Sequence, residues 1–438
     1  MGRERAHIVA ASRGMRRRTR LFAVFPATLV VAALALTFIG SDPPPHHVIL
    51  IGVDGFRWDY LDRYGEQAPN LRRLAEAGVR ARRLIPAFPT RTFPNFYSMA
   101  TGLRPERHGI VNNSMYDPVF DATFTIGDAS AVTDGRWWGG EPIWVTAERQ
   151  GVVAGTMFWV GSEAEIRGRR PSFWMRYDVR MPNEDRVDTV LAWLRRPRPP
   201  TLVLLYFSDL DRAGHDHGPD SPQVARALNA VDASVGRLLG GIEAMGLAER
   251  VDLVVAADHG MAAASRSAEW SIFLGDYTDL TQVRSGFGPS VGISPASNDP
   301  DTAAAQLARF EHDLLGAHPA LHVLRRETLA PGAAGEAERR WPPVTVVADE
   351  GWTIRSGRRA DYRPRDPMQV GGAHGYLPEA ETMHGIFLAY GPSFRKGVVL
   401  DRLHVVDIYG IIAHVLTLEP AENEGATEVI GEVVGPKG

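Results

Sequence analysis

The chain reads His-Val-Ile-Leu-Ile-Gly-Val-Asp-Gly at residues 47–55, and the expected architecture follows from this run. An unbroken apolar run that ends in an acid and a glycine is typical of a strand buried on both faces of a parallel sheet. Similar apolar runs recur at residues 201–207, 251–257 and 385–390. The pattern therefore predicts one central sheet that contains all four runs.

Helical patterns separate these strands. Apolar residues return every three or four positions at residues 69–78 and 223–246. The alternation predicts an α/β protein with a mainly parallel central sheet flanked by helices. Two stretches interrupt it. Residues 159–198, rich in arginine and aromatic residues, are expected to form a cap region, and residues 294–365 are expected to form a small inserted α+β subdomain with a helix near 302–315.

Composition limits the kinds of site that the chain can build. A chain of 438 residues with 44% hydrophobic content can bury a large core. It has no cysteine, which excludes disulfides, thiolate metal sites and a cysteine nucleophile. Any bound metal would be held by histidine, carboxylate and hydroxyl groups.

The first 41 residues differ from the remainder. Seven arginines precede an apolar run at residues 21–40, and three prolines follow at 43–45. We expect residues 1–41 to be a targeting segment, with two interpretations open. It is either a cleaved signal peptide or an uncleaved anchor, since the run approaches the roughly 20 residues that span a bilayer. Both interpretations predict export to a periplasmic or extracellular location, with membrane contact only through this segment.

Without the targeting segment the chain is acidic. The remaining residues carry 41 basic and 51 acidic groups, a formal charge of −10. A groove for a nucleic-acid polymer is therefore not expected. An anionic substrate would have to be small, and its site would need its own positive charge, most simply from metal ions.

Acidic residues and histidines lie next to the predicted strands. The candidate metal ligands are Asp54, Asp211, His215, Asp258, His259 and His374. Because ligands bind beyond the carboxyl ends of strands in open parallel sheets, residues that follow the strands are expected to meet at one edge. Carboxylates and imidazoles without a thiolate suit zinc first and manganese second. Asp211 and His215 are four residues apart, so one helical turn would place them on the same face.

Residues 89–102 have the pattern of a short helix with a hydroxyl at its start. Thr92 is expected to cap this helix, Pro94 is tolerated in the first turn, and Gly102 is expected to end it. Unpaired N–H groups at such a helix start can bind an anion beside Thr92. Thr90 is a competing hydroxyl, and we favour Thr92 because only Thr92 lies at the helix start.

Six sequence blocks carry a family resemblance. They are Ile-Gly-Val-Asp-Gly at 51–55, Thr-Arg-Thr-Phe-Pro-Asn at 90–95, Thr-Gly-Leu-Arg-Pro-Glu-Arg-His-Gly-Ile at 101–110, Asn-Asn-Ser-Met-Tyr-Asp at 112–117, Arg-Trp-Trp-Gly-Gly at 136–140 and Ala-Asp-His-Gly-Met at 257–261. In this order they resemble the nucleotide pyrophosphatase/phosphodiesterase family of the alkaline phosphatase superfamily, and the similarity runs from about residue 48 to about residue 418. The resemblance implies an alkaline-phosphatase-like catalytic domain over residues 42–438 that binds two zinc ions.

The resemblance also assigns the ligands. It implies that Asp211, His215 and His374 bind one zinc ion. It implies that Asp54, Asp258 and His259 bind the other, with the Thr92 oxygen facing the pair. Two metals about 4 Å apart can hold both the attacking and the leaving oxygen of an in-line displacement, and a coordinated hydroxyl has a lowered pKa.

Roles in catalysis and substrate binding follow from the same resemblance. It implies that Thr92 is transiently phosphorylated and that the Phe93 N–H and the Asn113 side chain meet the phosphoryl oxygens. Asn113 could equally be a turn residue. Phe93 and Tyr206 are expected to help form an aromatic slot for a base or an apolar leaving group. Further aromatic candidates, or else packing residues, are Phe173, Trp174 and Tyr177.

Several nearby residues compete with these assignments. Asp209 lies two residues before Asp211 and His217 two after His215, and we expect both to lie outside the ligand set. His108 and His384 are expected to be structural.

The expected activity is hydrolysis of phosphodiester or pyrophosphate bonds in nucleotide derivatives, which releases a nucleoside 5′-monophosphate. Two alternatives keep the fold and the metals: a phosphodiesterase for lipid head groups of the choline type, and a hydrolase of phosphonates or phosphate monoesters. A non-catalytic binding module would lack a ligand or the nucleophile, and this chain lacks neither.

Overall fold

The computed structural model describes residues 46–284, 286–363 and 370–436. The expected targeting segment, residues 1–41, lies outside the described residues, so its cleavage or retention stays a prediction. Among the described residues, no helix has both the length and the apolar character needed to cross a membrane.

The central sheet has eight strands in the order β18-β2-β17-β8-β1-β7-β5-β6. They are β1 (His47–Val53), β2 (Val79–Ile85), β5 (Ala154–Met157), β6 (Phe173–Met175), β7 (Leu202–Phe207), β8 (Val251–Ala256), β17 (Gly385–Tyr390) and β18 (Val398–His404). All seven residues of β1 are buried, because the strand lies between β7 and β8 and is covered on both faces. The apolar runs of the sequence thus correctly predicted four buried strands of one sheet.

One strand runs against the others. β17 pairs antiparallel with both β2 and β8, whereas the remaining neighbours pair in parallel. The sheet is therefore mainly parallel, as predicted, but the apolar run at 385–390 is not a parallel strand. Burial on both faces produces the same apolar pattern in either direction, so the run alone does not report the direction.

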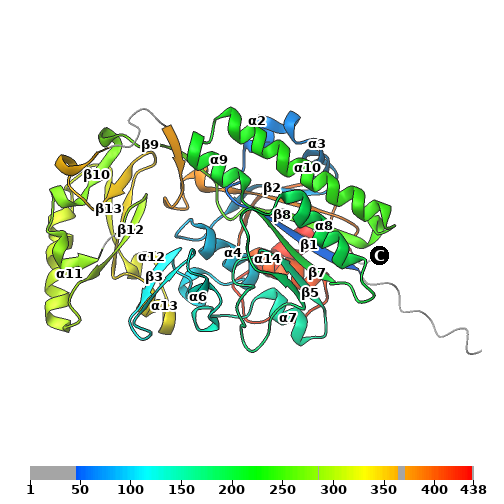
Figure 1. The fold of residues 1–438 in the computed structure, drawn as a ribbon, viewed down its shortest axis with the longest axis horizontal. Coiled ribbons are helices and arrows are strands. Elements are labelled where there is room, and N and C mark those ends of the chain that lie inside the picture. The colour runs from blue at the N-terminus through cyan, green and yellow to red at the C-terminus, as the bar shows by residue number, and fades with distance from the viewer. Residues whose placement is uncertain (1–45, 285, 364–369, 437–438) are drawn as a thin grey trace, which may run out of the picture. The chain divides into compact units, whose positions relative to one another are not determined.

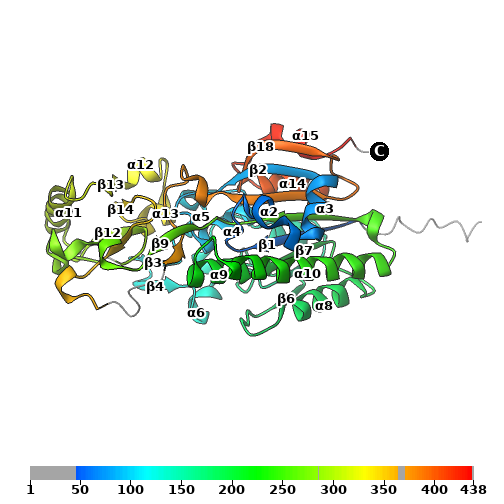
Figure 2. The same ribbon diagram turned by 90° about the horizontal axis from the view of Figure 1, so that it is seen from above.

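Helices flank the sheet in two groups. On one side α10 contacts α3, α8 and α9, and Figures 1 and 2 show α8, α9 and α10 lying together beside β1 and β7. A second group is formed by α4, α7 and α14, which contact one another. The helices of the two groups are α3 (Pro69–Ala77), α4 (Thr92–Thr101), α7 (Ile143–Arg149), α8 (Asn183–Leu194), α9 (Asp209–His217), α10 (Pro222–Ala244) and α14 (Asp407–Val415). Shorter helices are α2 (Tyr60–Tyr64), α5 (Pro105–His108), α6 (Ala129–Val132) and α15 (Thr427–Val433).

The expected cap, residues 159–198, is not separate from the central sheet. Its strand β6 is the edge strand beside β5, and its helix α8 packs on β5 and β7. Phe173 of β6 packs against Trp193 of α8 with ring centroids 5.7 Å apart. Part of this stretch therefore forms the edge of the central sheet through β6.

A second sheet forms the inserted subdomain. Its order is β11-β12-β14-β13, with α11 packed on it, and Figure 1 shows these elements apart from the central sheet. The elements are β11 (Val283–Arg284), β12 (Ser290–Pro295), α11 (Pro300–Leu314), β13 (Leu321–Arg325), α12 (Arg326–Leu329), α13 (Gly335–Arg340) and β14 (Val344–Ala348). This sheet has its own core, which extends from Ile272 to Ile354. The subdomain therefore begins about twenty residues before the expected boundary at 294, whereas its helix near 302–315 agrees with the prediction.

Three small two-stranded sheets complete the fold. They are β3 (Ser114–Asp117) with β4 (Ala122–Thr125), β9 (Ala262–Ser265) with β16 (Val370–Ala373), and β10 (Ser271–Phe273) with β15 (Thr353–Arg355). The first carries the residues just after Asn113, and the second carries the residues just before His374.

Candidate metal centre and nucleophile

Six predicted ligands meet at one edge of the central sheet. They form two groups, Asp54 with Asp258 and His259, and Asp211 with His215 and His374, and within each group one atom per residue lies within 4.8 Å of the others. The first group comes from the ends of β1 and β8, and the second from α9 and the segment after β16. Because β17 runs in reverse, its beginning lies where the parallel strands end, which brings the segment before it to this edge.

The turn after β1 brings the two groups together. The backbone N–H of Asp211 donates to the Asp54 carbonyl at 3.0 Å, and the Gly55 N–H donates to Asp258 Oδ1 at 3.2 Å. Gly55 has φ +68°, and a Cβ there would lie 2.8 Å from the Asp211 Cα. Only glycine both adopts this conformation without strain and lets α9 approach so closely.

Backbone carbonyls orient all three histidines. Nδ1 of His215 donates to the Gly372 carbonyl, Nδ1 of His259 to the Gly260 carbonyl and Nδ1 of His374 to the Thr90 carbonyl, each at 2.9 Å. A donating Nδ1 fixes the tautomer and leaves the Nε2 lone pair free as a ligand. The Nε2 atoms lie near the carboxylates, with His259 Nε2 3.0 Å from Asp258 Oδ2 and His374 Nε2 3.5 Å from Asp211 Oδ1.

The three carboxylates each keep one buried oxygen without a hydrogen-bond partner. These atoms are Asp54 Oδ1, Asp211 Oδ1 and Asp258 Oδ2. Burial raises the pKa of Asp54 well above its ordinary value, and the charges of Asp258 and Asp211 raise it further. Buried carboxylate oxygens without donors are costly unless a cation compensates them. The arrangement therefore fits divalent metal ions held by oxygen and imidazole ligands.

The histidines differ in their electrostatic surroundings. Burial lowers the pKa values of His259 and His374, which favours the neutral form that binds metals. Burial also opposes protonation of His215, but the nearby Asp211 carboxylate, the Gly372 carbonyl and the charge of Asp54 together raise its pKa to about 9. His215 Nε2 lies 3.3 Å from Asp211 Oδ1, so these two side chains are close enough to bind the same cation.

Thr92 points its hydroxyl toward the ligands. Its Oγ1 lies 3.4 Å from His259 Nε2. Thr92 is the first residue of α4, and the N-cap is Arg91, which makes no side-chain cap. The expectation that Thr92 caps the helix is therefore wrong, because its hydroxyl lies beside the candidate ligand His259 and accepts no bond from the backbone N–H groups of the helix. Gly102 ends the helix in the left-handed conformation, as expected.

Thr90 is engaged elsewhere. Its hydroxyl donates to the Tyr376 carbonyl at 2.8 Å and accepts from the Gly375 N–H at 3.0 Å, while its carbonyl holds His374. Thr90 thus connects the start of α4 to the His374 segment, and its hydroxyl is not directed at the six ligands.

Asn113 contacts the helix start directly. The Phe93 N–H donates to Asn113 Oδ1 at 3.0 Å. This N–H was expected to face a phosphoryl oxygen, and in the structure it donates to the asparagine side chain instead. Since the amide oxygen accepts this bond, the Asn113 Nδ2 group is the donor that remains for another partner.

The aromatic residues near the site have different neighbours. The Tyr206 hydroxyl donates to Asp54 Oδ2 at 2.6 Å, a contact that sequence reasoning missed. Phe93 packs against Phe124 and Trp138, with ring centroids 5.9 and 6.1 Å away. Tyr177 is 42% exposed and its ring centroid lies 6.2 Å from that of Tyr206, so it adjoins the predicted slot.

Two other predicted slot residues lie at the sheet edge. Phe173 packs against Trp193, and Trp174 is exposed beneath Arg170. Their part in a substrate slot stays a prediction.

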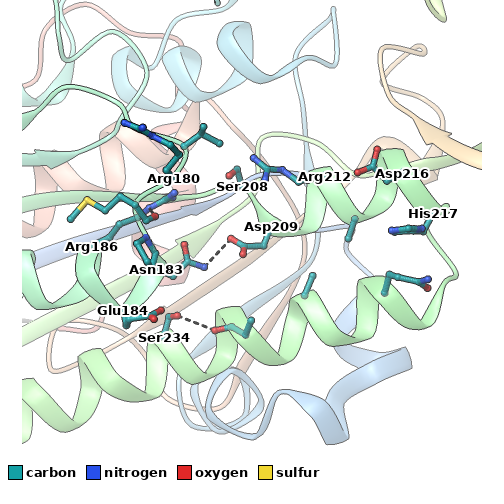
Figure 3. A pocket seen from close by; sticks show the side chains of 17 residues that line it. Arg180, Asn183, Glu184, Arg186, Ser208, Asp209, Arg212, Asp216, His217 and Ser234 are labelled. Carbon is teal, nitrogen blue, oxygen red and sulfur yellow. Dashed lines mark hydrogen bonds between the residues drawn. The ribbon is translucent and has the colours of Figure 1, made fainter.

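The competing acid and histidine on α9 lie away from the ligands. Asp209, Arg212, Asp216 and His217 line a pocket of about 500 Å³ (Figure 3), and neither Asp211 nor His215 is among its lining residues. Asp209 accepts a hydrogen bond from Asn183 at 2.9 Å.

The other two competing histidines make structural contacts. His108 Nε2 lies 3.0 Å from Ser98 Oγ, and His384 Nε2 donates to the Pro378 carbonyl at 2.8 Å. Both ligand groups lack the four competing residues Asp209, His217, His108 and His384.

A mainly parallel sheet that gathers two three-ligand groups beside a hydroxyl at one edge is the arrangement of the alkaline phosphatase superfamily. Residues 48–377 match the model of the type I phosphodiesterase / nucleotide pyrophosphatase family. The chain belongs to this family, as the sequence blocks predicted.

Known relatives agree with this placement. The human ectonucleotide pyrophosphatase/phosphodiesterase family member 1 is 33% identical over 392 residues, which cover 88% of this chain and 41% of that protein. Human family member 5 is 33% identical over 91% of this chain and 80% of its own length. The solved structure of murine family member 5 matches with a TM-score of 0.80 at 31% identity, over 89% of this chain and all of that chain. The chain thus spans about two-fifths of the length of family member 1.

Proposed function

We propose that the protein is a zinc-dependent phosphodiesterase/pyrophosphatase that hydrolyses nucleotide derivatives and releases a nucleoside 5′-monophosphate through a phosphothreonine intermediate. The observation that carries the proposal is the position of the Thr92 hydroxyl, 3.4 Å from His259 Nε2 and beside six candidate ligands, four of them buried. This hydroxyl makes no helix cap, so it is available as a nucleophile.

Two zinc ions would be held by the two groups already described. Asp211, His215 and His374 would hold one ion, and Asp54, Asp258 and His259 would hold the other together with Thr92 Oγ1. When bound, the ions would supply Lewis-acid charge that lowers the pKa of a hydroxyl and stabilises the negative charge of a phosphoryl group.

The chain's own residues would carry the reaction in two steps. Thr92 Oγ1 loses its proton and attacks the phosphorus, the ester or pyrophosphate leaving group departs with a proton, and the phosphorus stays on Thr92 with the nucleoside still attached. Water then attacks this phosphothreonine, which restores the hydroxyl and releases the nucleoside 5′-monophosphate. Asn113 Nδ2 would donate to a phosphoryl oxygen, because Asn113 Oδ1 is already held by the Phe93 N–H.

The relatives support the substrate class. Murine family member 5 has been solved as an inactive threonine-to-alanine variant in complex with AMP. An AMP complex of a relative that matches 89% of this chain favours a nucleoside monophosphate as the product here. Stacking of a base on Phe93, Tyr177 or Tyr206 would tolerate different bases.

The test compares rates on the nitrophenyl ester of thymidine 5′-monophosphate with rates on nitrophenyl phosphorylcholine and nitrophenyl phosphate. We expect the nucleotide ester to be the best substrate, Thr92→Ala to lose at least about 1,000-fold in kcat, and Thr92→Ser to keep part of the activity. Acid-quenched protein should carry the thymidine 5′-monophosphate group on Thr92, detectable by mass spectrometry. Wild-type activity of Thr92→Ala contradicts the nucleophile, and faster hydrolysis of the choline ester or the monoester contradicts the substrate class.

We also propose that the protein is exported through residues 1–41. The arginine-rich start followed by the apolar run at 21–40 supports this. Mass spectrometry of the mature N-terminus in the host distinguishes a cleaved signal from a retained anchor, and an intact chain in the cytosol contradicts export.

A further inference from the structure

We infer that Arg340, contributed by the inserted subdomain, is a positioning residue for the candidate site, because it holds both ends of the segment that carries Asn113. Arg340 is the last residue of α13, whereas Asn113 precedes β3 of the main body. The kinetic part of this inference rests on the proposed function.

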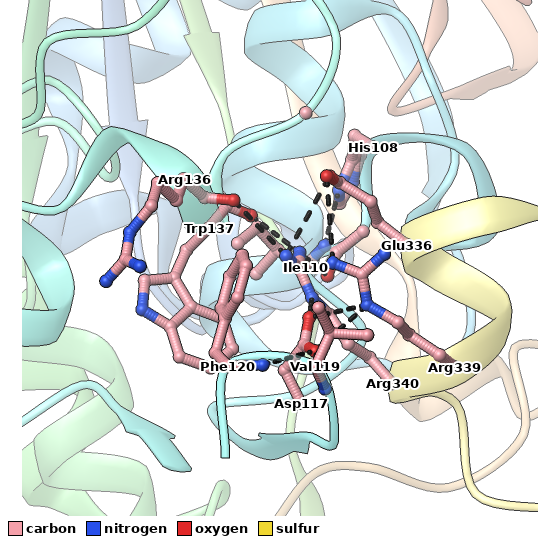
Figure 4. Close-up of polar contacts among 12 residues, drawn as sticks. His108, Ile110, Asp117, Val119, Phe120, Arg136, Trp137, Glu336, Arg339 and Arg340 are labelled. Atoms are coloured by element: carbon pink, nitrogen blue, oxygen red, sulfur yellow. Dashed lines mark hydrogen bonds and ion pairs between the residues drawn. The ribbon is translucent and has the colours of Figure 1, made fainter. Parts of the chain in front are cut away.

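The guanidinium of Arg340 is buried and fully engaged. Its Nε donates to Asp117 Oδ2 at 2.7 Å, and its Nη1 donates to the carbonyls of Gly109 and Trp137 at 3.1 and 2.8 Å. Its Nη2 donates to the Arg136 carbonyl at 3.2 Å. Figure 4 shows this side chain between Asp117 on one side and the Arg136 and Trp137 segment on the other.

Asp117 is equally satisfied. Its side chain is completely buried and also accepts from Arg339 Nε and from the backbone N–H groups of Val119 and Phe120. Burial alone would raise the pKa of Asp117, but the hydrogen bonds from Arg339 and Arg340 lower it to about 2. The aspartate is therefore charged at neutral pH, and a buried charge pair of this kind is costly to break from one side only.

The two anchor points bracket the segment 109–117. Gly109 lies at its beginning and Asp117 at its end, so one guanidinium fixes both, and Asn113 stands midway between them. Asn113 in turn accepts the Phe93 N–H at 3.0 Å, immediately after Thr92. A chain of direct contacts thus leads from α13, which packs on α5 and β3, to the start of α4.

The same guanidinium also holds the segment 136–138, whose Trp138 packs against Phe93. It holds the carbonyls of Arg136 and Trp137, and its Cζ lies 5.0 Å from the Trp137 ring centroid. The next residue, Trp138, packs against Phe93 and Tyr97 with ring centroids 6.1 and 4.9 Å away. Arginine suits this position because only its planar fork reaches a carboxylate and three carbonyls at once, whereas lysine would supply a point charge.

The experiment uses the full-length protein with Arg340→Lys and, because one-sided disruption of the pair could prevent folding, the neutral double variant Asp117→Asn with Arg340→Met. The matched control is Arg325→Met, since Arg325 makes a two-pronged pair with Glu311 inside the same subdomain. We expect Arg340→Lys and the double variant to lose 10-fold or more in kcat on the nitrophenyl ester of thymidine 5′-monophosphate. Their KM should change less than 3-fold, and the control should keep wild-type kinetics.

A double-mutant cycle separates positioning from general destabilisation. If Arg340 acts through Asn113, then Arg340→Lys should cost less than 2-fold in kcat once Asn113→Ala is present. Full loss in that background, or wild-type kcat in Arg340→Lys, overturns the inference.

Hydrogen exchange of the peptide that covers residues 109–117 gives a second readout that does not need activity. It should be faster in Arg340→Lys and unchanged in Arg325→Met, and equal exchange in all proteins overturns the inference. If the wild-type protein hydrolyses none of the esters, the proposed function fails, and the exchange result still shows whether Arg340 holds the segment.

Discussion

At the scale of single residues, the hydroxyl of Tyr206 is the contact that most changes the description of the site. The sequence predicted a ring for substrate stacking, whereas the structure gives the side chain a 2.6 Å hydrogen bond to Asp54, one of the candidate ligands. A partner of this kind fixes the ligand and raises metal affinity. Substrate stacking by the ring stays a prediction.

Removal of the Tyr206 hydroxyl should weaken metal binding. We expect Tyr206→Phe to bind zinc about 10- to 100-fold more weakly, because Asp54 loses the donor that holds it. Zinc content after dialysis against buffers of fixed free zinc measures the affinity. Tyr97→Phe is the matched control, since its hydroxyl donates to the Gly139 carbonyl at 2.8 Å and contacts no ligand. Equal affinity in Tyr206→Phe and wild type would contradict the role of this bond.

His108 should make stability depend on pH. Burial lowers its pKa to about 3, so the folded state keeps it neutral while the unfolded state protonates it near pH 6.5. Its contribution is therefore present above pH 6.5 and is lost as the pH falls toward 3. Between pH 7 and pH 5 the free energy of unfolding should fall by about 2 kcal/mol more in wild type than in His108→Asn. Urea unfolding at both pH values measures this, and parallel pH profiles would rule out the effect.

At the scale of elements, α4 joins the nucleophile to the fold. It begins at Thr92 and ends at Gly102, whose φ of +67° closes the helix. A Cβ at Gly102 would lie 2.7 Å from the Asn423 Cβ and 3.0 Å from the Tyr409 Cβ, so the residue needs both its conformation and its small size.

Gly102→Ala should therefore destabilise the protein more than a glycine substitution in open space. We expect a loss of about 3 kcal/mol, from left-handed strain and from forced displacement of neighbours. Gly151 is the matched control, because it has φ +79° with no atom within 4 Å of an added Cβ, and Gly151→Ala should cost only about 1 kcal/mol. Denaturant unfolding of the two variants gives the comparison, and equal losses would show that crowding at Gly102 is unimportant.

At the scale of the whole molecule, the candidate metal ligands come from chain segments more than 300 residues apart and meet beside an apolar core. The core itself is built from the apolar side chains of the buried strands and helices. Metal binding should thus stabilise the folded protein without being required for the fold.

Removal of metal should lower the melting temperature and leave the secondary structure unchanged. Without cations, the unpaired oxygens of Asp54, Asp211 and Asp258 are left buried beside one another. We expect chelation to lower Tm by about 5 °C or more and zinc to restore it, because a ligand of the folded state stabilises by mass action. Thermal melts followed by circular dichroism test this, with metal content measured in parallel. An unchanged Tm after verified metal removal would contradict a metal-filled site.

Local sequence carries much of this protein's description. Four apolar runs predicted four buried strands, because burial on both faces demands apolar residues in any chain. The acids and histidines beside those runs, together with the family blocks, predicted all six residues that the structure gathers. The helix over residues 92–101 was predicted from Pro94 and Gly102, since proline and glycine restrict or free the backbone wherever they occur.

Long-range contacts settle the remainder. The direction of β17, the carbonyls that aim three imidazoles, the engagement of Thr90 by Tyr376 and Gly375, and the reach of Arg340 all join residues distant in the chain. Every residue type has the same backbone carbonyl, so the sequence does not show which carbonyl accepts a given hydrogen bond. Residue types thus specified which groups are available to the site, and packing of the chain set which way each group points, because orientation depends on the partner that the fold brings near.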